Sequence, residues 1–374
     1  MACRCGSGFF LTMRILLLFS LALSIFSANT LTLDHPRWRT PLAEGGSPPS
    51  GIPVSNQGQV YFIYAGVQAY SADSGRLLWQ APVDSFLPAA LLADRHFVFV
   101  VEKRVFASDR STGKRAWEFS PDADASLCQA ALDGNTLFFG TSSHKVYALN
   151  ALDGHLLWTK DLQPGWQYPT VVRGVSIQND TIYVALERAE DMNGVKSSGW
   201  VFAMKAKDGE QLWKFHTDGE RPRQGASSAP VVGDKFVVVS DALDNSVFAL
   251  DRRTGLAAWR FDGERGFAGS SQTPIIVGGR VYAISGDRYV YALAMKSGQL
   301  LWRTQMPASN LAAAVCGSSL LINFEGLAAL DLSTGQVQKK KFSGNDEFVS
   351  SGFAVKNGRL FVAGPKAVYS FECR

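Results

Sequence analysis

The stretch VFALDRRTGLAAW, residues 247–259, decides the fold. In an extended strand Val247 and Ala249 point to one side, while Phe248 and Leu250 point to the other. All four side chains are apolar, and a strand that is apolar on both sides is buried on both faces. The stretch therefore predicts a strand between two neighbouring layers.

The second half of this stretch predicts a tight turn followed by an outer strand. Gly255 can adopt the positive φ that such a turn needs, and Asp251 or Thr254 can accept hydrogen bonds from its free backbone N–H groups. Trp259 then lies on the last strand, where a large ring with one polar edge suits a half-buried seam. We expect this tryptophan to cover the gap between two adjacent sheets.

The same phrase recurs along most of the chain. Further copies begin at Val67, Val105, Val146, Val201, Val290 and, in a weaker form, Leu327. The turns of all seven copies, the first stretch included, end in Gly75, Gly113, Gly154, Gly209, Gly255, Gly298 and Gly335, and neighbouring glycines in this series are 37 to 55 residues apart. Their outer strands end in Trp79, Trp117, Trp158, Trp213, Trp259 and Trp302. Self-similarity at this period is typical of repeat architectures.

Each period contains four short apolar runs, seen most clearly in SAPVVG, KFVVVSD, SVFALD and LAAWRF within residues 228–261. Four strands in a period of roughly 40 to 45 residues indicate one blade of a β-propeller. We therefore predict an all-β propeller of four-stranded antiparallel blades. A solenoid of stacked hairpins is the structural alternative.

The two ends of the repeat region complement each other. The last residues supply three strands, GFAVKN, RLFVAG and AVYSFE, and the missing outer strand is RWRTPL with Trp38. Joined, they form one composite blade, which leaves no open seam. With seven internal blades, this predicts an eight-bladed ring closed by the N-terminal strand.

The first residues indicate export. Arg14 precedes the apolar run of residues 15–23, and small residues follow at Ser24, Ser27 and Ala28. We expect residues 1–27 to be a cleaved signal peptide and residues 28–374 to be the propeller. A membrane anchor is the alternative, and Met13 is a candidate for the true start.

Charge and cysteines narrow the function classes. Residues 28–374 carry 35 basic and 33 acidic side chains, so nothing indicates a nucleic-acid partner. Cys128, Cys316 and Cys373 are an odd number without close spacing, so no disulfide framework is visible, and we expect Cys128 and Cys316 to be small core residues. The residues around Ser24 include no cysteine that could accept a lipid, so we expect a soluble periplasmic or secreted protein.

The phrase AxDxxTGxxxW, formed here by Ala249, Asp251, Thr254, Gly255 and Trp259, resembles the repeat of quinoprotein (PQQ-like) β-propellers. Within that family the chain is similar to the branch of the outer-membrane assembly factor BamB in length, export signal and compact blades. That resemblance implies a periplasmic scaffold without cofactor, whose partners are other envelope proteins. It also implies a monomer that reaches membranes only through those partners.

The quinoprotein dehydrogenases are the enzymatic alternative. Members of that branch bind pyrroloquinoline quinone and calcium at the ring centre, with extra inserts and an adjacent pair of cysteines. The cysteines of this chain are far apart in sequence, and its blades leave little room for inserts. We therefore expect no bound cofactor, no metal and no catalytic residue.

Other candidates for chemistry are few. The five histidines, His35, His96, His144, His155 and His216, show no metal-ligand spacing, and we expect the last three to be solvated in turns or loops. The segment DALDN from Asp241 lacks the following Gly and distant Glu of a calcium loop, and predicts a polar connection.

The longer insertions all fall on one face of the predicted ring, at residues 187–198, 218–225, 262–269 and 343–348. Loops on a rigid scaffold commonly carry binding, and arginine and aromatic side chains anchor protein partners. The candidate partner-binding face is formed by Arg221, Arg223, Arg265, Glu190, Asp191, Phe267 and Trp166. Simple solvated loops are the alternative. A sensor or sugar-binding propeller, with Trp166 and Tyr168 stacking on a sugar, is a third hypothesis.

Overall fold

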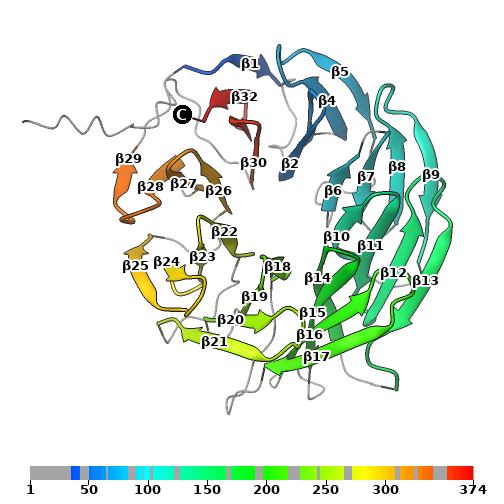
Figure 1. Ribbon diagram of the computed structural model, residues 1–374. Coiled ribbons are helices and arrows are strands. Elements are labelled where there is room, and N and C mark those ends of the chain that lie inside the picture. The colour runs from blue at the N-terminus through cyan, green and yellow to red at the C-terminus, as the bar shows by residue number, and fades with distance from the viewer. Residues whose placement is uncertain are drawn as a thin grey trace, which may run out of the picture. The chain divides into compact units, whose positions relative to one another are not determined.

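The computed structural model describes residues 35–373, apart from residues 43–49, 65, 83–89, 95, 102–103, 122–126, 166–169, 190–196, 218–227, 242–244, 265–271, 308–311, 324–326 and 340–351. These residues form β-strands joined by turns, arranged as sheets around a ring (Figure 1). The prediction of an all-β propeller of four-stranded antiparallel blades is confirmed. Within the described residues, no helix has the length and apolar character needed to cross a membrane.

Seven blades are each built from one continuous stretch of chain. Blade one is β2 (Ser50–Asn56), β3 (Gln59–Ile63), β4 (Val67–Ser71) and β5 (Leu77–Ala81), and blade two is β6 (Ala90–Ala93), β7 (Phe97–Val101), β8 (Val105–Asp109) and β9 (Arg115–Phe119). Blade three is β10 (Leu127–Asp133), β11 (Thr136–Thr141), β12 (Lys145–Asn150) and β13 (Leu156–Asp161), and blade four is β14 (Thr170–Gln178), β15 (Thr181–Ala189), β16 (Ser197–Lys205) and β17 (Gln211–Thr217). Blade five is β18 (Val231–Val232), β19 (Phe236–Asp241), β20 (Ser246–Asp251) and β21 (Ala257–Asp262), and blade six is β22 (Ile275–Val277), β23 (Arg280–Ile284), β24 (Tyr289–Ala294) and β25 (Leu300–Gln305). Blade seven is β26 (Ala312–Cys316), β27 (Ser319–Asn323), β28 (Leu327–Asp331) and β29 (Val337–Lys339).

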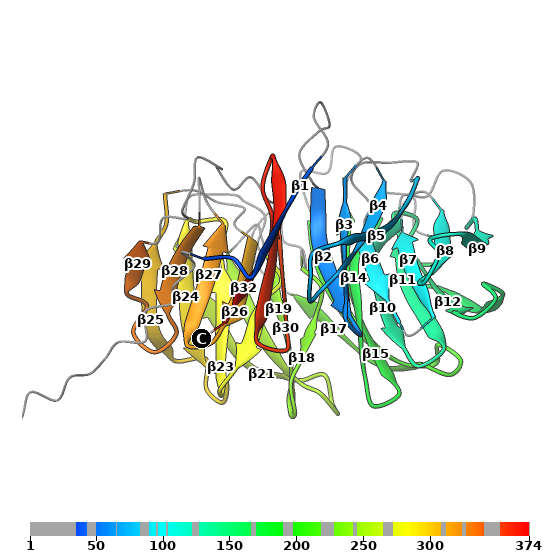
Figure 2. The ribbon, with the colours of Figure 1, turned by 90° about the horizontal axis from the view of Figure 1, so that it is seen from above.

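The composite blade is a further four-stranded sheet made from both ends of the described chain. It contains β30 (Phe353–Lys356), β31 (Arg359–Ala363), β32 (Ala367–Glu372) and β1 (Trp38–Pro41), with β1 paired antiparallel to β32. Trp38 lies opposite Ser370 and Arg39 opposite Tyr369. β1 and β32 lie side by side in both views (Figures 1 and 2). A count of continuous blades gives seven, and strand pairing adds this composite sheet as the eighth.

Both faces of each blade are buried against its neighbours, as the alternation in blade five shows. Phe248 and Leu250 pack against apolar residues of blade four, while Val247 and Ala249 pack against those of blade six. All four side chains are buried. The core is therefore a series of apolar layers between blades rather than one central cluster.

Tryptophan docks join seven pairs of neighbouring blades. The indole N–H of each donates to a backbone carbonyl oxygen in the next blade, at 2.7 to 3.2 Å: Trp38 to Ala72, Trp79 to Arg110, Trp117 to Ala151, Trp158 to Ala206, Trp213 to Arg252, Trp259 to Met295 and Trp302 to Leu332. The ring of each also covers the turn glycine of that next blade. The expectation that these tryptophans close the seams is confirmed.

The turn glycines are required for two reasons, which Gly255 illustrates. Its φ of +73° lies in the left-handed region that favours glycine. A Cβ at this position would also lie 2.6 Å from the ring of Trp213. The carboxylate of Asp251 accepts hydrogen bonds from the N–H groups of Arg253 and Thr254, as the turn chemistry predicted.

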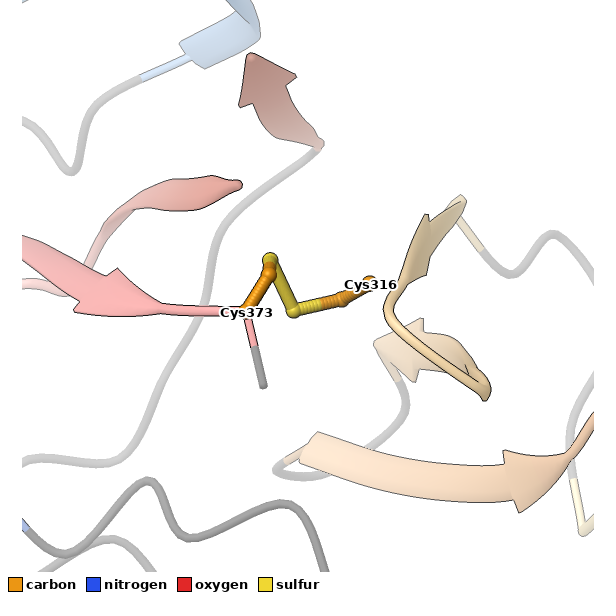
Figure 3. Close-up of a disulfide and its surroundings, with 2 residues drawn as sticks. All are labelled: Cys316 and Cys373. Atoms are coloured by element: carbon orange, nitrogen blue, oxygen red, sulfur yellow. A yellow bond between two sulfur atoms is a disulfide. The ribbon is translucent and has the colours of Figure 1, made fainter. Parts of the chain in front are cut away.

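A disulfide corrects the sequence interpretation of the cysteines. Cys316 and Cys373, 57 residues apart in sequence, are bonded with their Cα atoms 4.9 Å apart (Figure 3). Cys316 is buried, as expected, but as one half of a covalent link between blade seven and the composite blade. Sequence spacing could not show this pair because ring closure brings together strands that are distant in the chain.

Candidate functional site

The ring has two faces with different connections. Because the strands of a blade alternate in direction, the turns after the first and third strands lie on one face, called here the docking face. The connections between second and third strands, and between blades, lie on the opposite face, called here the loop face. The described strand ends that flank the predicted insertions lie on the loop face.

The candidate partner-binding residues Arg221, Arg223, Arg265, Glu190, Asp191, Phe267 and Trp166 all lie outside the described residues, as does Tyr168. The structure therefore does not test whether they come together. It does describe the strand ends from which these loops start, in blades four, five and six. These strand ends define the base of the loop face.

In blade four, a tryptophan and two cations form the base of the loop face. β15 and β16 are nine residues each and carry Arg188 and Trp200 near their loop ends. The guanidinium carbon of Arg188 lies 5.4 Å from the centre of the Trp200 ring, and the ammonium nitrogen of Lys214 lies 5.2 Å from it. The indole N–H of Trp200 is buried and makes no hydrogen bond within the described residues. Cations at this distance are attracted by the ring face.

His216 belongs to the same cluster, which corrects the expectation that it is solvated in a loop. It lies within β17, is half-buried, and its ring centre is 4.2 Å from that of Trp200. His144 and His155 do lie in turn regions, where each contacts a carboxylate, of Asp161 and Asp153 respectively, at 2.7 Å. The prediction for His216 was wrong because the sequence before the insertion does not show where β17 ends.

Blades five and six are joined at the loop face by a buried polar network. Asp287 accepts hydrogen bonds from the hydroxyl of Tyr291 at 2.7 Å and from the backbone N–H of Glu264 at 2.9 Å. Asn245 donates to the carbonyl oxygen of Glu264 at 3.1 Å and accepts from the hydroxyl of Ser285 at 3.0 Å. Burial and the hydrogen bond to Asp287 raise the pKa of Tyr291 well above its usual range. Asp287 and Asn245 are nearly inaccessible to solvent, so the network stabilises the contact between blades five and six.

This network holds the beginning of the loop that leads to Arg265 and Phe267. A Cβ on Gly263 would lie 2.8 Å from Asp287 Oδ2, so only glycine fits beside the carboxylate. Asp262 accepts hydrogen bonds from Ser246 at 2.7 Å and Arg260 at 2.6 Å. Hydrogen bonds from blades five and six therefore hold Asp262 and the backbone of Glu264 in place.

The described residues show little that could hold a metal ion. No group of three or more His, Cys, Asp or Glu side chains is placed to do so within the described part of the chain. Asp241 and Asn245, at the two ends of the DALDN segment, are buried, and Asn245 serves the network above.

Known proteins with related sequences place the chain in a family. A family model described as outer membrane protein assembly factor BamB matches residues 32–190 and 151–318, together more than half of the chain. BamB of Yersinia pestis is 26% identical over 234 residues, which are 57% of this chain and 55% of the relative. A quinoprotein ethanol dehydrogenase of Pseudomonas aeruginosa is 30% identical over 149 residues, 37% of this chain and 24% of the enzyme. The match thus spans about half the length of the BamB relative.

Solved structures agree on the fold. The crystal structure of BamB from Moraxella catarrhalis superposes with a TM-score of 0.66, covering 89% of this chain and 100% of that one. The identity is 16%, at which the likeness shows the architecture alone. From the sequence match over more than half of its length, we conclude that this chain belongs to the family of the outer membrane protein assembly factor BamB.

Proposed function

We propose that this protein is a non-catalytic binding scaffold of the bacterial envelope that contacts partner proteins through its loop face and takes part in outer-membrane protein assembly. The family match over residues 32–318 is the observation that carries this proposal. The base of the loop face adds physical support, because arginine and tryptophan side chains dominate the energetics of many protein interfaces. Arg188, Lys214 and Trp200 lie at that base.

We further propose that the mature protein begins after residue 27 and works in the periplasm. The disulfide between Cys316 and Cys373 supports an oxidising compartment, because cytosolic thiols are kept reduced. N-terminal sequencing of the protein purified from its native envelope tests the cleavage. A mature chain that retains residues 15–23 would favour a membrane anchor instead.

Charge reversal on the loop face tests the binding proposal. Arg221→Glu combined with Arg265→Glu should remove most of the envelope proteins that co-purify with the tagged chain. The matched control is Lys114→Glu with Arg253→Glu, which makes the same charge change on exposed docking-face turns. An unchanged partner set in the loop-face variant, or an equal loss in the control, would contradict the proposal.

The dehydrogenase alternative has a separate test. A ligand that binds only the folded state raises the melting temperature, so pyrroloquinoline quinone with calcium should shift a quinoprotein enzyme by several degrees. We expect no such shift for this chain. A clear shift, together with quinone-dependent oxidation of an alcohol, would replace the scaffold proposal with an enzymatic one.

A further inference from the structure

The seam between blade seven and the composite blade lacks the parts of a tryptophan dock. In blades one to six, a β-bulge in the outer strand precedes the docking tryptophan, as in blade six where the register shifts next to Trp302. In blade seven β28 and β29 pair without any shift, and the sequence places Lys339 where the other blades have tryptophan. Gln338, opposite Ala329, has a buried side-chain oxygen without a hydrogen-bond partner in the described structure.

The receiving side of this dock is also missing. In blades one to seven the tryptophan of the preceding blade covers a turn glycine between the third and fourth strands. The composite blade takes its fourth strand, β1, from the other end of the chain, so β32 is not joined to it by such a turn. Neither half of the contact that closes the other seams is therefore present at this one.

The disulfide lies at this seam. Cys316 is the last residue of β26, the first strand of blade seven, and Cys373 follows β32, the third strand of the composite blade (Figure 3). First and third strands both end on the docking face, where the tryptophan docks lie. The Cys373 N–H also donates to the carbonyl oxygen of Gly358 at 2.7 Å, which ties the end of β32 to the turn before β31.

We propose that the Cys316–Cys373 disulfide is a redox-controlled clasp that closes the eighth seam in place of a tryptophan dock. Without the bond, blade seven and the composite blade are held together by an apolar cluster that includes Leu321, Tyr369 and Phe371. With it, the two strands are joined covalently on the face where the other seams carry a tryptophan.

The clasp forms by thiol–disulfide exchange. The two cysteine thiols lose two protons and two electrons to the disulfide of an oxidoreductase, which becomes a dithiol as the Cys316–Cys373 bond forms. The reverse reaction needs a thiolate to reach a sulfur atom. Cys316 is fully buried and Cys373 is partly exposed, so attack falls on Cys373. The covalent link therefore forms in an oxidising compartment and is released in a reducing one, independently of which partners the scaffold binds.

The experiment compares the oxidised and reduced full-length protein. Peptide mass spectrometry without reductant should find residues 316 and 373 in one linked peptide. Dithiothreitol should then raise amide hydrogen exchange in β26 and β32, the two strands that the bond joins, at least tenfold, leave β9 and β13 unchanged, and lower the melting temperature by roughly 5 to 10 °C.

Two variants keep the test decisive. Cys316→Ser with Cys373→Ser should match the reduced protein and no longer respond to dithiothreitol, whereas Cys128→Ser should respond like wild type. If the double variant fails to fold, reduction of the preformed wild-type protein gives the same comparison. Absence of the linked peptide, or reduction that frees both thiols without changing exchange or melting, would overturn the proposal, as would an exchange increase spread evenly over all blades.

Discussion

Two seams of the ring are held together by different contacts. One lies between blades four and five, and the other between blade seven and the composite blade. At the first, Trp213 is buried, covers Gly255 and donates its indole N–H to the Arg252 carbonyl at 2.9 Å. At the second, a disulfide joins Cys316 to Cys373. The tryptophan contact needs a turn that joins the third and fourth strands of the receiving blade. The composite blade has no such turn, because β32 and β1 come from opposite ends of the described chain.

The comparison shows what a ring closed by two chain ends requires. Strand β1 completes the composite blade and carries Trp38, so the seam toward blade one keeps its dock. The opposite side of the same blade loses the turn because its outer strand comes from elsewhere in the chain. A covalent bond at that position compensates for a contact that the topology removes.

Replacing a docking tryptophan should have the largest effect. We expect Trp213→Ala to lower the free energy of unfolding by about 3 to 5 kcal/mol, because it leaves a cavity beside Tyr183 and an unpaired carbonyl at Arg252. Trp213→Phe keeps most of the apolar contact and should cost about 1 to 2 kcal/mol. Urea unfolding at neutral pH measures both. Equal losses for the two variants would mean that the ring itself contributes little to the seam.

Crowding the receiving turn should have an intermediate effect. Gly255→Ala places a Cβ 2.6 Å from the Trp213 ring at a φ of +73°, so we expect a loss of roughly 2 to 4 kcal/mol. Gly134→Ala is the control, because it also has a positive φ, +53°, but nothing lies within 4 Å of the added Cβ. It should lose about 1 kcal/mol. Similar losses at both glycines would remove the argument that the dock selects Gly255.

Acid should weaken the turns that receive the docks, with the smallest effect. Hydrogen bonds from Ser111, Thr254 and Ser333 lower the pKa of Asp109, Asp251 and Asp331, respectively, below the ordinary value of 3.8. A lowered folded-state pKa adds stability that is fully present above pH 3.8 and is lost as the pH falls through the folded-state value. These aspartates are partly exposed to solvent, so screening limits the contribution of each turn to roughly a few tenths of a kcal/mol.

A triple Asn variant at these three aspartates isolates that contribution. The stability difference between wild type and variant, from urea unfolding at pH 7 and again near pH 3, should shrink at the lower pH. A difference that stays constant between the two conditions would show that the turn carboxylates do not titrate as the hydrogen bonds imply.

Much of the fold is predictable from sequence because the repeat is local. The alternation around Phe248, the turn at Gly255 and the tryptophan at 259 lie within one stretch, so each can be recognised without knowing its neighbours. The composite blade follows from the complementary ends of the repeat. The disulfide does not, because it depends on which strand ends meet when the ring closes, and the sequence separation of 57 residues carries no sign of that.

The loop-face cluster is harder to predict for a related reason. The side chains of this cluster come from two strands of blade four: Trp200 from β16, and Lys214 and His216 from β17. Their proximity depends on the register in which these two strands pair. The buried Asp287 network joins residues of two blades and has no sequence motif. Loop residues such as Arg221 and Arg265 could be proposed from composition, and their grouping remains a prediction.

Ring closure through β1 is the central claim, and a cross-link tests it most directly. Arg39 and Tyr369 lie directly opposite each other on β1 and β32. Cysteines introduced at both positions should therefore form an intramolecular disulfide under mild oxidation, found by mass spectrometry as a linked peptide from monomeric protein. Arg39→Cys paired with Tyr289→Cys, on blade six, should form no such link. Free thiols at 39 and 369, or links only between chains, would contradict the closed ring.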